Sequence, residues 1–338
     1  SSRDYFTNTI SWMIAHALYE GPPSELWIVG VDMAVSSEYC VGPGTRVLTA
    51  GLEWVEAAKL GEGDEVVAFD EECSRDGFGA RRYRRATVEA AQRVVLPSVE
   101  VTLSDGTVLV CSKEHRWLSH EQNQHSWRRA DALLTGDHRS DGKPSRLVRL
   151  LDTWDTLDTY EAGYLAAAFD GEGHLSMPVS GRGAGSQAGS ISLGFSQREN
   201  AMSERVDRLL AGIGFDVSIH TDPSGCRKYG VRGGREAVLR FLGSVRPPRL
   251  LSKFDPDRLG TLQSIATPEV VSVRDLGDVE LVALRTSEGT FVADGIASHN
   301  SAQRPSCEYW LGVAEAMGVA VRLPMESDLL KCAVAYGV

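Results

Sequence analysis

The sequence lacks the paired cysteines and the long apolar runs that would place it among disulfide-rich or membrane-spanning proteins. Its six cysteines lie far apart and form no C-x-x-C pair, which argues against a disulfide framework and against a structural zinc site. No window approaches about 18 uncharged apolar residues, and the first residues lack both the order of a signal peptide and an initiator Met. We therefore expect a cytoplasmic fragment or processed chain that does not cross a membrane.

Low-complexity and strongly charged regions are also scarce. Hydrophobic residues make up 42% and charged residues 24% of the 338 residues, as in an ordinary globular chain of two or three domains. The formal net charge is −11, but residues 180–260 carry an excess of five basic side chains. A basic block inside an acidic chain favours a contact with nucleic acid.

The two ends of the chain differ in pattern from its middle. Residues 1–39 and 301–338 alternate helix-like stretches with short apolar strands such as ELWIVG and VAVRLP, which predicts one α/β unit divided between them. Between them, Gly-punctuated runs such as SVEVTLSDGTVLVCS at 98–112 and VVSVRDLGDVELVALRT at 270–286 predict β-strands. A β-rich domain therefore interrupts the α/β unit.

A third segment interrupts the β-rich domain. Residues 155–260 contain a helix-like stretch from Tyr160 to Phe169, the helical pattern ENAMSERVDRLLAGIG, and a last helix REAVLRFLGSV, with two strand-like runs in each interval. The predicted order is α-β-β-α-β-β-α. The chain is therefore expected to contain an inserted segment within a β-rich domain, which itself interrupts an α/β unit.

The borders of the β-rich domain carry a set of groups with complementary chemistry. The thiol of Cys40 can attack the preceding carbonyl and convert the amide to a thioester, and the hydroxyl of Ser301 can then accept the acyl group. The side-chain amide of Asn300 can cyclise on its own carbonyl and break the chain after itself. The neighbouring His299 can polarise that carbonyl or protonate the leaving nitrogen. These residues predict excision of residues 40–300 and ligation of Tyr39 to Ser301.

Residues 40–300 resemble an intein, which implies a mostly β Hint domain of horseshoe shape. CVGPGTRVLT resembles the amino-terminal splicing block, GTFVADGIASHNS the carboxy-terminal blocks, and Ser112-x-x-His115 the family's T-x-x-H with Ser in place of Thr. An Asp usual on the late strand is missing, with Val282 or Ala283 in its place and Asp278 some distance away. The expected catalytic set is Cys40, Ser112, His115, His299, Asn300 and Ser301, without a cofactor. The expected divisions are 1–39 host segment, 40–154 splicing domain, 155–260 inserted domain, 261–300 splicing domain and 301–338 host segment.

LAAAFDGEG at 165–173 resembles the LAGLIDADG motif of homing endonucleases, which implies an α+β DNA endonuclease. The family's metal-binding acid falls at Glu172, expected just past the helix end, with Asp170 beside it as a second metal candidate or a cap. Carboxylate ligands suit Mg²⁺. One motif supplies one such acid, so cutting both strands of double-stranded DNA implies a homodimer that pairs these helices. By position, Gln197 and Lys253 are further catalytic candidates.

Strands in the basic block would form a saddle in the DNA major groove. The residues expected to contact DNA are Arg182, Arg198, Arg227, Lys228 and Arg232. The remaining histidines of the insert are interpreted as solvated surface. The cluster RRYRRA at 81–86 is interpreted in the same way, with contact to DNA as the alternative.

Three other interpretations of the sequence stay open. A hedgehog-like autoprocessing domain shares the β fold, although His299-Asn300-Ser301 argues against it. The host α/β segments could bind a nucleotide or another anion at the loop that would form when Tyr39 joins Ser301. The nuclease could also be decayed.

Overall fold

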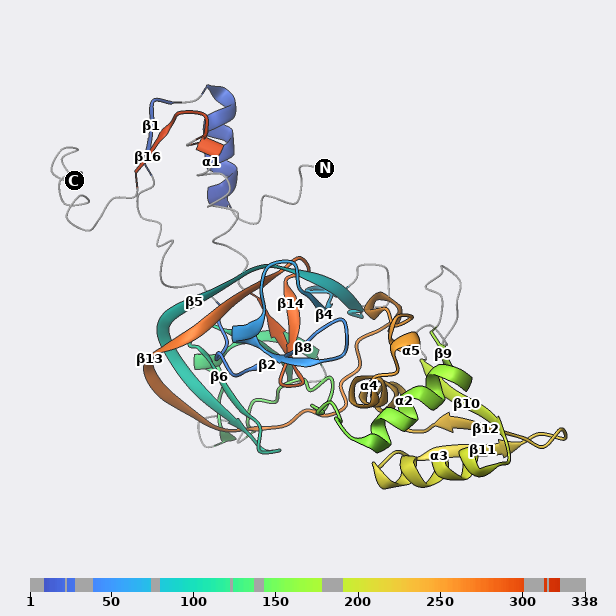
Figure 1. Ribbon diagram of the computed structural model, residues 1–338. Helices are drawn as coiled ribbons and strands as arrows, with labels where there is room; N and C mark the ends of the chain where they lie inside the picture. Colours follow the sequence, from blue (N-terminus) through green and yellow to red (C-terminus); the bar gives the residue numbers. More distant parts are fainter. Residues whose placement is uncertain are drawn as a thin grey trace. The chain divides into compact units, whose positions relative to one another are not determined.

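The computed structural model describes residues 9–21, 23–27, 39–73, 80–121, 124–136, 143–177, 191–300, 313–314 and 316–322. The chain divides into two compact units, which are residues 1–38 together with 301–338, and Tyr39–Asn300 (Figure 1). None of the helices in the described ranges is long and apolar enough to cross a membrane. Ser301 and Arg182, two of the predicted site residues, lie outside these ranges.

The smaller unit combines segments from both ends of the chain. It contains α1 (Thr9–Glu20), β1 (Glu25–Trp27) and β16 (Ala320–Arg322). Strands β1 and β16 pair in parallel, with Glu25 opposite Ala320. Parallel pairing requires a long connection between strands, and here the whole of the larger unit lies in that connection.

The larger unit is mostly β. One antiparallel sheet has six strands in the order β3-β2-β14-β15-β7-β8, and a second has the order β13-β5-β4 with β6 paired to β5. The bounds in the first sheet are β2 Arg46–Leu48, β3 Trp54–Glu56, β7 Arg116–Glu121, β8 Gln124–Arg129, β14 Thr290–Ala293 and β15 Ile296–His299. The bounds in the second sheet are β4 Glu65–Phe69, β5 Tyr83–Leu103, β6 Val108–Ser112 and β13 Val270–Thr286. Three short 3₁₀ helices in the described ranges are η1 Ala57–Lys59, η2 Ala130–Ala132 and η4 Pro256–Arg258.

Two long strands join the halves of the β-rich domain. β5 and β13 pair from Val88 opposite Thr286 to Leu103 opposite Val270, with three irregularities in register. Figure 1 shows them as a long curved ribbon beside the shorter strands. The prediction that residues 81–86 are solvated surface is wrong, because β5 begins there and buries Arg81 and Tyr83 at 8% and 1% exposure.

The inserted segment has the predicted order of elements. These are α2 (Tyr160–Glu172), β9 (Gly173–Ser176), β10 (Ser192–Arg198), α3 (Ala201–Gly212), β11 (Val217–Thr221), β12 (Cys226–Val231) and α4 (Gly234–Val245), followed by α5 (Pro248–Leu251). The four strands form an antiparallel sheet in the order β11-β12-β10-β9. Aromatic rings pack the helices against this sheet. The ring centroid of Phe169 on α2 lies 4.5 Å from that of Phe241 on α4 and 5.3 Å from that of Phe195 on β10.

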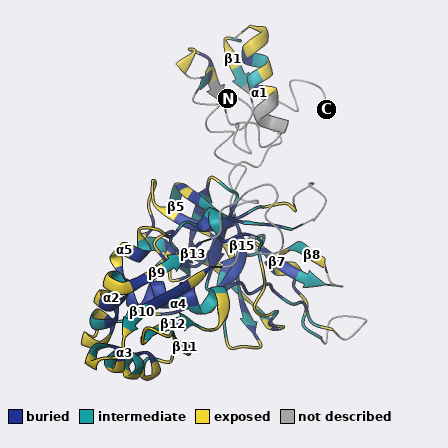
Figure 2. Ribbon diagram, turned by 90° about the vertical axis from the view of Figure 1, so that its right-hand side faces the viewer, coloured by how far each residue is buried: buried dark blue, intermediate teal, exposed yellow. Residues whose placement is uncertain are grey.

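A single hydrophobic cluster continues from the β-rich domain into the inserted segment. It includes Leu52 and Phe69 on one side and Phe169 and Phe241 on the other. At the junction, Trp154 donates a hydrogen bond from Nε1 to the Leu52 carbonyl at 3.2 Å. Figure 2 shows buried residues in the central strands, whereas exposed residues line the outer sides of α2 and α3. The inserted segment is therefore packed against the β-rich domain rather than joined to it only by linkers.

Candidate functional site

The two borders of the β-rich domain meet in space. Val41 forms two backbone hydrogen bonds with Val282 of β13, at 3.1 and 2.8 Å. Asn300 donates from Nδ2 to the carbonyl of Thr286 on the same strand, at 2.9 Å. The Tyr39 ring contacts the His299 ring edge-on, with centroids 5.1 Å apart. The Tyr39–Cys40 bond and the His299–Asn300 pair therefore lie in one place, although 259 positions separate Cys40 from His299 in the numbering.

Ser112 holds the backbone of Cys40 from both sides. The Cys40 N–H donates to Ser112 Oγ at 3.1 Å, and the Ser112 N–H donates to the Cys40 carbonyl at 3.0 Å. The Cys40 side chain is fully buried and packs with Leu96 and Leu281. Ser112 thus contacts the Cys40 backbone through both its hydroxyl and its own N–H. The result is a fixed thiol next to the Tyr39 carbonyl.

His115 is fully buried beside the same bond. Its Nε2 lies 3.0 Å from Ser298 Oγ, and its ring lies 4.4 Å from that of Trp117. Burial, reinforced by the nearby His299, lowers the pKa of His115 to about 3, and the Tyr39 backbone opposes that shift. A group with this pKa is neutral at physiological pH, so His115 offers a neutral imidazole to the Tyr39–Cys40 bond.

His299 and Asn300 form the second half of the site. Nδ1 of His299 lies 2.7 Å from the carbonyl oxygen of Asn300, and Nε2 lies 2.8 Å from Oε1 of Glu71. The Asn300 amide also lies 3.3 Å from Oγ1 of Thr286. Asn300 is 1% exposed and His299 is 3% exposed. The Asn300 carbonyl is therefore in contact with an imidazole and shielded from water.

Sequence reasoning missed Glu71 and Thr286. Neither residue belongs to a recognisable spacing, since Glu71 follows β4 in the run FDEEC and Thr286 ends β13. The position at which the resembled family has an Asp is used differently here, because Val282 pairs with Val41. Asp278 is exposed on β13. Proximity to Asn300, rather than a motif, is the signal that identifies the two missed residues.

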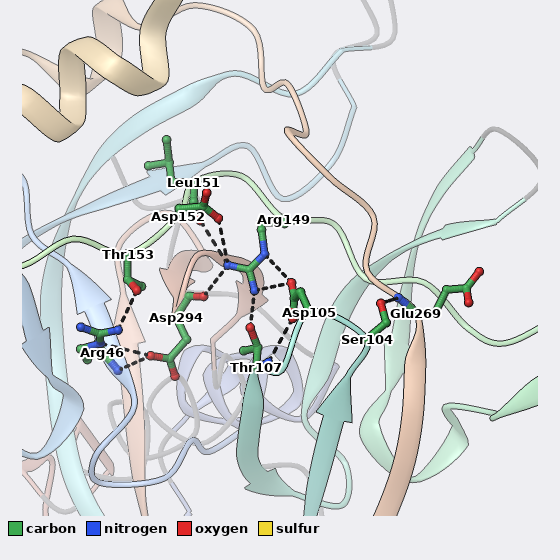
Figure 3. Close-up of polar contacts among 10 residues, drawn as sticks. All are labelled: Arg46, Ser104, Asp105, Thr107, Arg149, Leu151, Asp152, Thr153, Glu269 and Asp294. Carbon is green, nitrogen blue, oxygen red and sulfur yellow. Dashed lines mark hydrogen bonds and ion pairs between the residues drawn. The ribbon is translucent and has the colours of Figure 1, made fainter. Parts of the chain in front are cut away.

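A buried arginine fixes the turn that leads into β15. Arg149 is 6% exposed and donates from Nε to Asp105 at 2.9 Å and from Nη1 to the Asp294 carbonyl at 3.3 Å (Figure 3). Gly295 follows with φ +82°, and a Cβ there would lie 2.0 Å from the Leu151 carbonyl oxygen. Only glycine fits this close approach. The turn is thus fixed four residues before His299.

Two of the residues expected at the nuclease centre, Asp170 and Glu172, lie in the last turn of α2. Glu172 is exposed and is the last residue of α2, so the prediction that it lies past the helix is wrong. The helix extends because Arg249 donates to the carbonyls of Phe169 and Gly173, at 3.1 and 2.7 Å. Asp170 accepts from the backbone N–H groups of Arg249 and Leu250, so its carboxylate caps α5.

The other expected nuclease residues have ordinary contacts. Gln197 donates from Nε2 to Met202 Sδ at 3.4 Å, and Lys253 is exposed just beyond α5. Within the described residues, no group of three or more His, Cys, Asp or Glu side chains could hold a metal ion.

The basic residues of the sheet divide between its two faces. Arg227 faces α3, where it pairs with Asp207 at 3.0 Å and is only 16% exposed in its side chain. Lys228 pairs with Asp222 at 3.4 Å and Arg232 with Asp216 at 3.6 Å, and both remain exposed, as does Arg198. Alternation along a strand explains the difference, because neighbouring side chains point to opposite faces. Arg227 is thus committed to internal packing.

Comparisons with known proteins identify similar structures but no family. No family model matches the chain, and no curated protein matches it. Solved structures similar to it include a DnaB intein from Synechocystis sp. PCC 6803, which is 10% identical with a TM-score of 0.34 and covers 78% of this chain and 99% of that one. The Ssp DnaB mini-intein variant M86 is 12% identical with a TM-score of 0.36, covering 80% and 99%. The gp41-1 intein is 12% identical with a TM-score of 0.32, covering 77% and 98%.

Proposed function

We propose that the chain is a self-splicing precursor that excises residues 40–300 and joins Tyr39 to Ser301. The observation that carries this proposal is the meeting of the Tyr39–Cys40 bond and Asn300 around two buried histidines, His115 and His299. A buried thiol, a buried asparagine and two imidazoles at one point are costly to assemble without a use, because polar groups lose hydration on burial.

The first step uses the amino-terminal border. The Cys40 sulfur attacks the Tyr39 carbonyl carbon, the C–N bond breaks, and the thiol proton ends on the released nitrogen of Cys40. With Nε2 of His115 accepting from Ser298, Nδ1 carries the proton that passes to that nitrogen, and the ring regains one proton from the thiol, so the imidazole ends neutral. The product is a thioester between Tyr39 and Cys40.

The next steps use the carboxy-terminal border. The Ser301 hydroxyl attacks the thioester carbon and releases the Cys40 thiol. Nδ2 of Asn300 then attacks its own carbonyl carbon, the bond to Ser301 breaks, and the proton lost by Nδ2 balances the one gained by the Ser301 nitrogen. The Thr286 carbonyl, 2.9 Å from Nδ2, orients this amide. The freed amine of Ser301 finally displaces its own ester oxygen, which leaves a normal peptide bond.

Two variants test the proposal by blocking opposite ends. Cys40→Ala should abolish splicing and amino-terminal cleavage but leave cleavage after Asn300. Asn300→Ala should leave cleavage between Tyr39 and Cys40, which added thiol accelerates by capturing the thioester. Mass spectrometry of the products distinguishes these outcomes. Ligated product from either variant would overturn the assignment.

We also propose that the inserted segment is a DNA endonuclease that acts as a dimer. The observation in its favour is one face of α2, where Gly163, Ala167 and Gly171 recur every four residues, are exposed, and lead to exposed Glu172. An added Cβ at Gly163 or Gly171 would meet nothing within 4 Å. Small residues at this spacing permit close approach of a second helix, and a two-fold axis would bring two Glu172 side chains together.

Glu172 and its counterpart would hold Mg²⁺ between the two copies. The bound ion would stabilise the charge that develops on the scissile phosphate. DNA would lie on the sheet face opposite the helices, where Lys228 and Arg198 are exposed. Binding should weaken steeply with salt, because phosphate contacts release counterions.

The nuclease proposal is tested on a plasmid that carries the uninterrupted Tyr39–Ser301 junction. Glu172→Gln should retain DNA binding and lose cleavage, whereas Glu161→Gln, at an exposed acid in the first turn of the same helix, should retain both. Gly163→Leu should leave the chain folded and monomeric in sedimentation. Cleavage in the presence of a chelator would contradict the role of the metal, and binding without any cleavage would identify a decayed nuclease.

A further inference from the structure

Glu71 is an acidic residue in contact with the carboxy-terminal half of the site, and it belongs to none of the motifs identified in the sequence. It lies two residues beyond β4, and its side chain is 48% exposed. Its Oε1 lies 2.8 Å from Nε2 of His299. That hydrogen bond is the main reason why the pKa of Glu71 lies below its ordinary value. The carboxylate is therefore ionised at neutral pH and directed at His299.

Several elements fix Glu71 in this place. Its backbone carbonyl accepts from Nε1 of Trp127 at 3.2 Å and from Nε of Arg81 at 3.1 Å. Just before it, Phe69 exchanges two hydrogen bonds with the side chain of Thr290, at 2.9 and 2.5 Å. Gly289 leaves room for the carboxylate, since an added Cβ would lie 3.0 Å from Oε2 of Glu71. The segment is thus held by β8, by the start of β5 and by the β13–β14 turn.

The geometry around His299 places an acceptor at each ring nitrogen. Nε2 faces the Glu71 carboxylate, and Nδ1 faces the carbonyl oxygen of Asn300. A neutral imidazole has one N–H and can satisfy only one of these acceptors, whereas an imidazolium satisfies both. The Asn300 carbonyl oxygen gains negative charge when Nδ2 attacks, so a donor at this position stabilises the transition state.

We propose that Glu71 is a positioning residue for Asn300 cyclisation, which holds His299 so that a protonated Nδ1 points at the Asn300 carbonyl. The inference rests on the proposed splicing function and gives it a carboxylate from the segment after β4, whereas the missing Asp would lie on β13 near Val282. Glu71 touches none of the reacting atoms in this role. It acts through His299.

The other groups around His299 differ in charge and role. His115, the residue just before β7, is neutral, and the Tyr39 ring contacts the His299 ring edge-on. Arg116 and Arg81 lie close enough to favour the ionised form of Glu71. Among the described residues that contact the His299 ring, Glu71 is thus the one that carries a negative charge.

The test isolates cyclisation in a Cys40→Ala chain, which cannot form the thioester, and follows cleavage after Asn300. Glu71→Gln should slow this cleavage about 10- to 100-fold, as expected for loss of a hydrogen bond between charged groups. As the pH is raised, cleavage should also begin to slow at a lower pH in Glu71→Gln than in the parent. Glu71→Asp should recover part of the rate. Glu72→Gln removes the same charge one residue later, and should match the parent.

Two further measurements separate positioning from a structural role. In a His299→Ala chain, Glu71→Gln should cause no additional loss, because Glu71 acts only through that ring. In an Asn300→Ala chain, thiol-dependent cleavage at Tyr39–Cys40 should be unchanged by Glu71→Gln. Equal losses at both ends would overturn the inference, and so would an unaltered rate and pH profile. If the Cys40→Ala parent does not cleave and the Asn300→Ala parent does not either, the splicing proposal itself fails, and the role of Glu71 fails with it.

Discussion

The polar groups near Asn300 and those at the end of α2 are arranged in opposite ways. Around Asn300 they are buried and in contact with one another, as the pairs formed by His299 with Glu71 and by Asn300 with Thr286 show. At the end of α2, Glu172 is exposed, and no group of three or more His, Cys, Asp or Glu side chains in the described part of the chain could hold a metal ion. A reaction built into one chain needs its groups preorganised, whereas a binding surface is completed by its partner.

The comparison therefore separates an activity that one chain can perform from one that requires assembly. The proposed splicing chemistry should be independent of protein concentration, because all of its residues belong to one chain. DNA cleavage should depend on concentration, because each copy supplies one Glu172. Predictions that break or sharpen this distinction follow, from the largest effect to the smallest.

Loss of the His115 imidazole should have the largest effect. His115→Ala should slow thioester formation by about 10²- to 10⁴-fold, the usual contribution of a positioned acid or base. The measurement is the rate of thiol-dependent cleavage at Tyr39–Cys40 in an Asn300→Ala chain. Cleavage after Asn300 in a Cys40→Ala chain should change far less. A rate unaffected by His115→Ala would show that the buried ring does not act in the first step.

Replacement of residues 155–260 by a short Gly/Ser linker should lower stability by several kcal/mol while leaving the splicing residues in place. Removal of the insert exposes Leu52 and Phe69 of the shared cluster, and each large apolar side chain contributes about 1.5–3 kcal/mol on burial. Urea unfolding measures the loss, and splicing at low temperature should persist in part. Unchanged stability would mean that the two regions are energetically independent.

Gly243→Ala should disturb the junction between the two regions specifically. An added Cβ would lie 2.1 Å from Nε1 of Trp154 and 2.5 Å from the Leu52 carbonyl oxygen. Overpacking of this kind costs about 1–3 kcal/mol, which denaturant unfolding detects. Gly163→Ala is the matched control, since its position on α2 is open, and it should stabilise the chain by up to about 1 kcal/mol.

The smallest expected effect is the pH dependence that His115 gives to stability. Its folded pKa of about 3 lies below the ordinary 6.5, so the unfolded chain binds more protons between these values. Stability from this group is complete above pH 6.5 and falls as pH decreases from 6.5 towards 3. Between pH 8 and 6 the loss should be up to about 1 kcal/mol, and His115→Gln should flatten the slope by that amount. An identical slope in the variant would contradict a neutral buried imidazole.

The sequence contained enough information for the order of elements in the inserted segment, but not for the contacts between distant strands. Cys40 and Asn300 were singled out because each carries chemistry at a change of pattern, and His115 because Ser112-x-x-His115 resembles a family motif. Glu71 and Thr286 were not, because their roles arise only when β4 and β13 approach Asn300. The 21-residue length of β5 was also missed, since its middle is rich in Ala and polar residues, and pairing with β13 sustains it.

The same limit explains the errors in the inserted segment. Arg227 was grouped with DNA-contacting residues by charge, but strand alternation turns it towards Asp207 on α3. Glu172 was placed beyond α2, but Arg249, 77 positions later, caps that helix and lengthens it. Charge and local propensity identify the type of surface, and tertiary packing decides which side chains belong to it.

The most direct test of the account is mass spectrometry of the purified chain after incubation at neutral pH without DNA or metal. The account predicts an excised product of residues 40–300 and a ligated product in which Tyr39 is followed by Ser301, at rates independent of protein concentration. The excised product should end in the succinimide of Asn300 or its hydrolysed form. An intact chain that yields neither product, and that also fails to cleave between Tyr39 and Cys40 with added thiol, would contradict it.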